Sequence, residues 1–167
     1  MEDKKLFIGI GIFTVLIFIL AVALFKFLPS RARMAKNSDA KIEFTETKFS
    51  FGDIPYSGGN AQHVFKVKNT GYGPLTLANF STSCMCTKVL FQGTGGKSPE
   101  FGMKGMSQPS SWKGSLTPGE SGEVVVIFDP TAHGPQGVGP ISRVVSFETS
   151  DPNQPYVEFA FDGTVVK

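Results

Sequence analysis

Two patterns of apolar residues divide this chain. Residues 6–28 are almost continuously apolar, whereas from residue 42 onward the apolar residues come in short runs separated by turn residues. At a rise of about 1.5 Å per residue, a helix of the first length crosses a bilayer core of about 30 Å. Short runs with turn signals between them are typical of a β-sandwich. The sequence therefore predicts one N-terminal transmembrane helix followed by an all-β domain.

The expected strands are runs rich in Val, Ile, Phe and Thr that end near Gly, Pro, Asn or Asp. We expect strands at residues 42–44, 48–51, 62–68, 75–80, 86–91, 124–128, 142–149 and 156–166. The run at residues 124–128 is apolar without interruption, which favours a central strand buried on both faces. The prediction is a sandwich of about seven to eight strands.

The longest interruption of this pattern is residues 92–115. They are rich in Gly, Ser, Pro and Lys and contain Met103, Met106 and Trp112. A loop of this length inside a compact domain is usually functional or disordered. We therefore expect an insert at this edge of the domain, directly after the run at residues 86–91.

Length, composition and charge narrow the class of protein. The 167 residues, 41% of them hydrophobic, allow one core of ordinary size plus an appendage. The basic residues gather around the apolar segment, so the domain itself has no basic stripe for nucleic acid. The chain also lacks the Gly-x-Ser-x-Gly elbow and the Gly-Lys-Ser/Thr phosphate loop. We expect neither nucleic-acid binding nor catalysis.

A series of short motifs resembles one bacterial family. In chain order they are Phe51-Gly52-Asp53-Ile54, Val64-Phe65-Lys66-Val67-Lys68-Asn69-Thr70-Gly71, Pro74-Leu75, Ser83-Cys84-Met85-Cys86-Thr87, Pro118-Gly119-Glu120-Ser121-Gly122, Phe128-Asp129-Pro130 and Gly163-Thr164-Val165-Val166. Together they resemble domain-of-unknown-function family 1573, whose members are similar to the sandwiches of the ASPM, SPD-2 and Hydin proteins. The resemblance covers nearly all of residues 49–166. It implies an Ig-like fold and export or membrane anchoring, with no established activity. Two features depart from the family: Met85, where Gly is common between the cysteines, and the insert.

The expected organisation is a tail at residues 1–5, a signal-anchor helix at 6–28, a basic juxtamembrane linker at 29–41 and an Ig-like sandwich at 42–167. More basic residues follow the helix than precede it, and this bias alone favours a cytoplasmic domain. The N-terminal position of the helix and the family resemblance favour the opposite orientation. We expect an extracytoplasmic domain held on the lipid bilayer by residues 6–28.

The candidate chemistry centres on Cys84 and Cys86, the two cysteines of the chain. On an extended strand they would share one face with Cα atoms about 6.6 Å apart, so a disulfide between them would be strained. Two thiolates on one face can bind a soft ion, and thiolate with thioether is the ligand set of Cu(I). The nearest candidates for further ligands are Met103 and Met106.

The two histidines, His63 and His133, are more distant options for this site. With two cysteines they do not have the ligand spacing of a structural zinc site. Cysteines in a sandwich can also be structural, as buried thiols or a disulfide. A thiol-redox pair normally needs a basic neighbour or a helix N-terminus to lower one thiol pKa, and only Lys88 is near in sequence.

These observations leave three functions open. The first is a membrane-anchored, non-catalytic interaction module, a subunit or accessory of a cell-envelope or membrane complex with an unidentified protein partner. The second is a Cu(I)-binding or copper-delivery protein that uses Cys84 and Cys86, aided by Met103 or Met106. The third is a thiol-redox protein.

Overall fold

The computed structural model describes residues 2–26 and 31–167. The chain forms two compact units, Met1–Ser30 and Arg31–Lys167, and each is described by itself. The first unit contains helix α1 (Glu2–Lys26), whose side chains are described at Phe7 and from Gly9 to Leu24 and are exposed. Among the described residues, no helix meets the length and apolarity needed to cross a membrane. The predicted span at residues 6–28 stays a prediction, and its last two residues lie outside the described residues.

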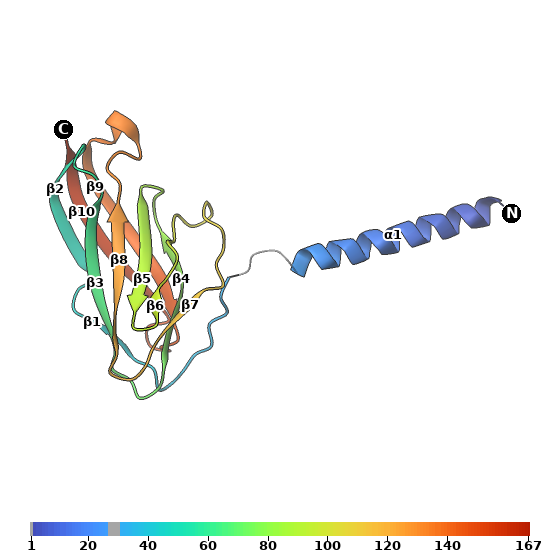
Figure 1. The fold of residues 1–167 in the computed structure, drawn as a ribbon, viewed down its shortest axis with the longest axis horizontal. Coiled ribbons are helices and arrows are strands. Elements are labelled where there is room, and N and C mark those ends of the chain that lie inside the picture. Colours follow the sequence, from blue (N-terminus) through green and yellow to red (C-terminus); the bar gives the residue numbers. More distant parts are fainter. Residues whose placement is uncertain (1, 27–30) are drawn as a thin grey trace. The chain divides into compact units, whose positions relative to one another are not determined.

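The second unit is a sandwich of two five-stranded sheets (Figure 1). Its strands are β1 (Ile42–Phe44), β2 (Lys48–Pro55), β3 (Ala61–Asn69), β4 (Leu75–Thr82), β5 (Thr87–Gly93), β6 (Gly96–Lys97), β7 (Lys113–Leu116), β8 (Ser121–Phe128), β9 (Gly139–Thr149) and β10 (Tyr156–Val166), with a 3₁₀ helix η1 (Gly134–Gly137) between β8 and β9. One sheet has the order β1-β3-β8-β5-β6 and the other β2-β10-β9-β4-β7. The predicted all-β sandwich is confirmed, with more strands than the seven to eight expected, because β6 and β7 lie in or at the end of the predicted insert.

The core lies between the two sheets and is rich in phenylalanine. Phe65, Phe147, Phe159 and Phe161 are almost completely buried, and the rings of Phe65 and Phe159 stack with centroids 4.5 Å apart. Strand β8 is central, as expected, because β3 and β5 flank it. The expectation that both of its faces are buried is wrong. The burial of β8 alternates instead, so only one face contacts the core.

The predicted insert packs on the sandwich instead of forming a long loop. Phe101 is 7% exposed and forms an antiparallel bridge with Val89 of β5. The ring of Trp112 lies 5.8 to 6.0 Å, centroid to centroid, from the rings of Phe80, Phe91 and Phe101. Phe101 and Trp112 pack the segment against β4 and β5. Their role is not evident from the sequence because the residues around them are mostly Gly, Ser and Pro.

The described part of the expected linker, residues 31–41, is not a free spacer but packs on the sandwich. Ala32 and Ala40 are buried, and the Ala32 N–H donates to the Ser110 carbonyl oxygen at 3.1 Å. The side chain of Asn79 accepts from the Ala32 N–H and donates to the Ala32 carbonyl oxygen. Asn79 has a φ of 55°, a conformation that asparagine tolerates better than most residues. This segment is therefore docked along the sandwich.

A buried asparagine explains the Asn69-Thr70-Gly71 motif. Asn69 is fully buried, and its amide nitrogen donates to the carbonyl oxygens of Gly73 and Leu116, each at 2.9 Å. Its side-chain oxygen accepts from the Gly71 N–H at 3.0 Å. One side chain thus satisfies three backbone groups and joins the β3–β4 turn to the end of β7.

Candidate metal site

The two cysteines lie in a tight turn between β4 and β5, not within a strand as predicted. The N–H of Thr87 donates to the carbonyl oxygen of Cys84 at 3.2 Å, which closes the turn. Because β4 and β5 belong to different sheets, the turn carries the chain from one sheet to the other. The extended geometry assumed for Cys84 and Cys86 therefore does not apply, and the turn brings the N–H of Cys86 to 3.4 Å from Cys84 Sγ.

Short polar side chains hold this turn in place. The hydroxyl of Thr82 donates to the carbonyl oxygens of Cys84 and Thr87 at 2.8 and 3.1 Å. The Ser83 N–H donates to the carbonyl oxygen of Val144 on β9, and the Val144 N–H donates to Ser83 Oγ, both at 2.9 Å. Thr82 thus stabilises the turn from within, and Ser83 ties it to the neighbouring strand β9.

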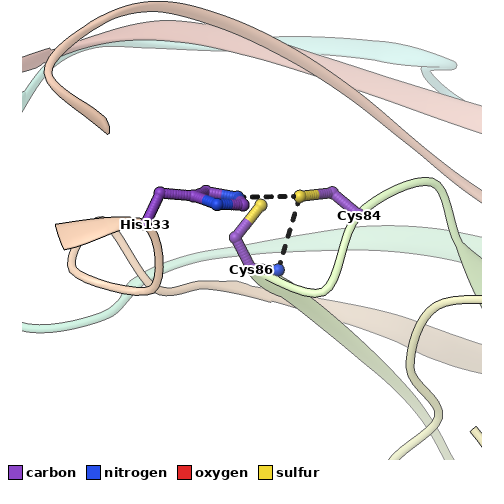
Figure 2. Close-up of side chains that lie close together, drawn as sticks. All are labelled: Cys84, Cys86 and His133. Atoms are coloured by element: carbon purple, nitrogen blue, oxygen red, sulfur yellow. Dashed lines mark hydrogen bonds between the residues drawn. The ribbon is translucent and has the colours of Figure 1, made fainter. Parts of the chain in front are cut away.

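A second connection between the sheets supplies the third residue of the site. Residues 129–138 link β8 to β9, and the Asp129 carboxylate accepts from the N–H and the hydroxyl of Thr131 at 2.8 and 2.6 Å. The Gly134 N–H donates to the Thr131 carbonyl oxygen at 2.8 Å, and Gly134 has a φ of +66°. This compact turn presents His133 toward the cysteine turn, as Figure 2 shows.

The three side chains converge on one point (Figure 2). His133 Nε2 lies 3.2 Å from Cys84 Sγ, and one ligand atom from each of Cys84, Cys86 and His133 lies within 4.8 Å of the others. Bonds of about 2.0 to 2.3 Å to one ion would set these atoms about 3.5 to 4 Å apart, so small side-chain movements suffice. Cys86 is buried, Cys84 is half-buried and His133 is exposed, which leaves one side of the site open to solvent.

Arg143 on β9 adds a positive charge to the site. Its Nε donates to Cys86 Sγ at 3.3 Å, and its Nη1 donates to the carbonyl oxygen of Ser142 at 2.8 Å. A hydrogen bond to sulfur from outside the ligand set is compatible with metal binding by that sulfur and orients it.

The two thiols have opposite pKa shifts. Burial works to raise the pKa of Cys84, but hydrogen bonds from Cys86 and His133 and the charge of Arg143 outweigh it and lower this pKa to about 7. The pKa of Cys86 is raised, first by burial and then by its hydrogen bond with Cys84, although Arg143 works in the other direction. The more exposed thiol is therefore the more acidic one, and it is the thiol that deprotonates first as pH rises.

The structure places the other predicted ligands elsewhere. Met103 forms a bridge with Thr82 and lines a hollow with Asn79 and Phe80, and Met106 is 68% exposed in the same segment. Their role as ligands stays a prediction. His63 stacks on Phe49 with ring centroids 3.6 Å apart and hydrogen-bonds to Glu46, so it is a structural histidine.

Sequence reasoning gave His133 no special weight and missed Arg143. The signal that could have found His133 is the Phe128-Asp129-Pro130 motif. Phe128 pairs with Thr87 in the β5–β8 register, so the residues after Phe128 begin beside the cysteine turn. No comparable signal points to Arg143, whose position depends on how β9 pairs with β4.

The fold and the site define a small Ig-like β-sandwich with a thiol and imidazole cluster between two of its connections. The model of the family "Protein of unknown function (DUF1573)" matches residues 42–97, about a third of the chain. The predicted family resemblance is thereby confirmed over this stretch, which contains both cysteines but neither His133 nor Arg143. The chain matches no protein with a curated description.

Solved structures share the fold at low sequence identity. A crystal structure of a protein of unknown function from Porphyromonas gingivalis W83 is 17% identical with a TM-score of 0.57, over 78% of this chain and 50% of that one. The chain thus spans about half the length of that protein. A family 123 glycoside hydrolase from Clostridium perfringens is 8% identical with a TM-score of 0.50, over 77% of this chain and 27% of that one. The ASH / PapD-like domain of human CEP192 (PapD-like domain 7) is 18% identical with a TM-score of 0.47, over 80% of this chain and 91% of that one.

Proposed function

We propose that this domain binds Cu(I) through Cys84, Cys86 and His133. The observation that carries the proposal is the convergence of two sulfurs and one imidazole nitrogen within 4.8 Å of one another. Thiolate sulfur is the ligand type that selects Cu(I), and imidazole is also a copper ligand. The three residues come from two connections that the fold itself fixes, so the cluster exists before any ion binds.

The composition of the cluster favours copper over a structural zinc ion. Structural zinc sites are almost always closed, with four Cys or His ligands. Here the cluster of His, Cys and carboxylate ligands that the described residues form has three members, one of which is exposed. A site of two soft thiolates and one imidazole with an open side suits an ion that is received from one protein and passed to another. Met85, which lies between the two cysteines in the chain, is 51% exposed.

The test is a competition titration of the full chain in detergent, kept reduced, with Cu(I) and a colorimetric Cu(I) chelator. We expect an affinity tighter than micromolar that weakens at least about a hundredfold in Cys84→Ser and Cys86→Ser, because each change removes one of the ligands. His133→Ala should weaken it less. His63→Gln is the matched control, since His63 lies away from the site, and should leave it unchanged. Micromolar or weaker binding that is equal in all variants would refute the proposal.

A thiol-redox role is a second candidate, favoured by the asymmetry of the two thiols. Cys84 is half-buried with a pKa of about 7, and Cys86 is buried. An attacking thiol near its thiolate form beside a buried resolving thiol is typical of disulfide exchange. Intact mass after equilibration with reduced and oxidised glutathione tests this. A reversible loss of two hydrogen atoms (two protons and two electrons) from the dithiol, taken up by one oxidised glutathione to give two thiols, would support it.

We further propose that residues 6–28 anchor the domain to the extracytoplasmic side of a membrane, as a non-catalytic accessory or subunit of a membrane complex. The almost continuously apolar sequence of this segment supports the anchor. The test is fractionation of cells that express the full chain, followed by labelling of intact cells with a membrane-impermeant maleimide. We expect the protein in the membrane fraction and Cys84 labelled from outside. A soluble protein, or labelling only after lysis, would contradict the proposal.

A further inference from the structure

We infer that Arg143 determines the metal specificity of this site by favouring a monovalent ion over a divalent one. The inference rests on the proposed Cu(I) binding and goes one step further, because it assigns the selectivity to a residue that is not a ligand. The geometry that points to it is the contact between Arg143 Nε and Cys86 Sγ, at 3.3 Å.

The position of Arg143 is fixed by two hydrogen bonds on one guanidinium group. Nε points to the sulfur of Cys86, and Nη1 donates to the carbonyl oxygen of Ser142 at 2.8 Å. The side chain is only half-exposed, and the sulfur it contacts belongs to a residue that is 2% exposed. The charge of Arg143 therefore acts on the site over a short distance and with limited screening by water.

No carboxylate in the described part of the chain forms an ion pair with Arg143. The hollow of about 340 Å³ that contains His133 and Arg143 is lined otherwise by Phe128, Pro130, Gln136, Gly137, Val138, Pro140 and Ile141. Neither of the ion pairs found among the described residues involves Arg143. The thiolates of Cys84 and Cys86 are therefore the partners available to this guanidinium.

The selectivity follows from counting charges. Two thiolates and a neutral imidazole around Cu(I) carry a net charge of −1, and Arg143 brings the half-buried cluster to zero. The same ligands around Zn(II) are already neutral, so Arg143 would leave an uncompensated positive charge there. Because an unpaired charge away from water is costly, the guanidinium stabilises the monovalent complex and destabilises the divalent one.

The experiment compares Cu(I) and Zn(II) affinities of the full chain in detergent for wild type, Arg143→Gln and Arg143→Lys. Each affinity is measured at one pH by competition with a chromophoric chelator of known affinity for that ion. For Arg143→Gln we expect Cu(I) binding to weaken by about tenfold while Zn(II) binding stays equal or becomes tighter. Arg143→Lys keeps the charge and should keep the ratio of the two affinities within about threefold of wild type. Lys66→Gln, which removes an exposed charge from β3, is the matched control and should change neither affinity.

Several outcomes separate this inference from its alternatives. Equal weakening of both ions in Arg143→Gln would show that Arg143 only supports the structure of the turn, and would overturn the inference. A second variant, Arg143→Thr, guards against a folding defect in Arg143→Gln, because threonine is a good strand former. If both variants leave the ratio of Cu(I) to Zn(II) affinity unchanged, the inference is also overturned. Failure of the proposed function looks different, because wild type itself would then bind Cu(I) no better than Cys84→Ser.

Discussion

The backbone N–H of Asp129 donates to the carbonyl oxygen of Cys86 at 2.9 Å. This hydrogen bond joins the turn that carries the cysteines to the turn that carries His133. The Asp129 side chain then stabilises its own turn by accepting two hydrogen bonds from Thr131. The position of His133 thus depends on Asp129, which stabilises the turn.

Replacement of the Asp129 carboxylate should therefore loosen His133 without touching the thiols. In Asp129→Ala we expect Cu(I) affinity to fall by about tenfold, in the range found when a group that orients a metal ligand is removed. Asp129→Asn retains an acceptor at Oδ1 and should recover most of the affinity. As a control, alkylation of unfolded Asp129→Ala and Asp129→Asn should still detect two free thiols per chain. Equal affinity in Asp129→Ala and wild type would contradict this coupling.

The reactivity of Cys84 should titrate near neutral pH. Because the thiolate is the reactive form and the pKa of Cys84 is lowered to about 7, its alkylation rate in the metal-free protein should rise with pH and reach half-maximum near pH 7. A free cysteine has its midpoint near 8.5. The measurement is the initial rate of iodoacetamide modification at Cys84, followed by peptide mass spectrometry between pH 5 and 10, a window set about those pKa values.

His133→Ala is the informative variant for this titration. It removes one of the hydrogen bonds that lower the pKa of Cys84, so the midpoint should move to higher pH. His63→Gln should leave the pH midpoint of Cys84 alkylation unchanged. A midpoint that is the same in wild type and His133→Ala would show that His133 does not act on the Cys84 thiol in solution.

Asn69→Ala should destabilise the sandwich strongly. The change removes the side-chain partner of the Leu116 carbonyl oxygen in a buried hydrogen bond, and of the Gly73 carbonyl oxygen and the Gly71 N–H in two part-buried ones. We expect the free energy of unfolding to fall by about 3 kcal/mol, since each buried unsatisfied group costs about 1 to 3 kcal/mol. Urea denaturation measures this, with the exposed Asn60→Ala as control. A loss below about 1 kcal/mol would contradict the role given to Asn69.

Trp112 provides a direct probe of the packed insert, because it is the one tryptophan of the chain. Its fluorescence should change together with the far-ultraviolet circular dichroism in a single unfolding transition, since its ring packs on Phe80, Phe91 and Phe101. Trp112→Ala should lower the free energy of unfolding by about 2 to 3 kcal/mol, somewhat less than for a fully buried ring. A fluorescence transition that precedes the loss of β structure would show that the insert detaches independently.

Much of the sandwich is predictable from the sequence because its strands are short apolar runs between strong turn signals. The expected bounds of β1 and β10 agree with the structure residue for residue, and β8 is central as its apolar run suggested. The insert at residues 92–115 was predicted, but its packing on the sandwich was not, for the opposite reason. Its anchors, Phe101 and Trp112, stand alone among Gly, Ser and Pro, and isolated residues have no periodicity.

The site was only half predictable. The spacing of Cys84 and Cys86 indicates that the two cysteines act as a pair. A strand and a turn place such a pair differently, however, and the local sequence does not show which of the two conformations forms. His133 lies 49 residues beyond Cys84, and only the pairing of β5 with β8 brings it close. The contact of Arg143 with Cys86 depends in the same way on the arrangement of β9 beside β4. Long-range pairing of this kind is a property of the whole domain.

The two turns that meet at the site both carry the chain from one sheet to the other, β4 to β5 and β8 to β9. An ion shared by Cys84 and His133 would close a loop of 49 residues and act as a reversible cross-link between the sheets. At an ion concentration of about a hundred times Kd, binding adds about 2.7 kcal/mol to stability. The unloaded protein would then open more often and be degraded sooner by proteases, so the supply of the ion would set how long each molecule survives.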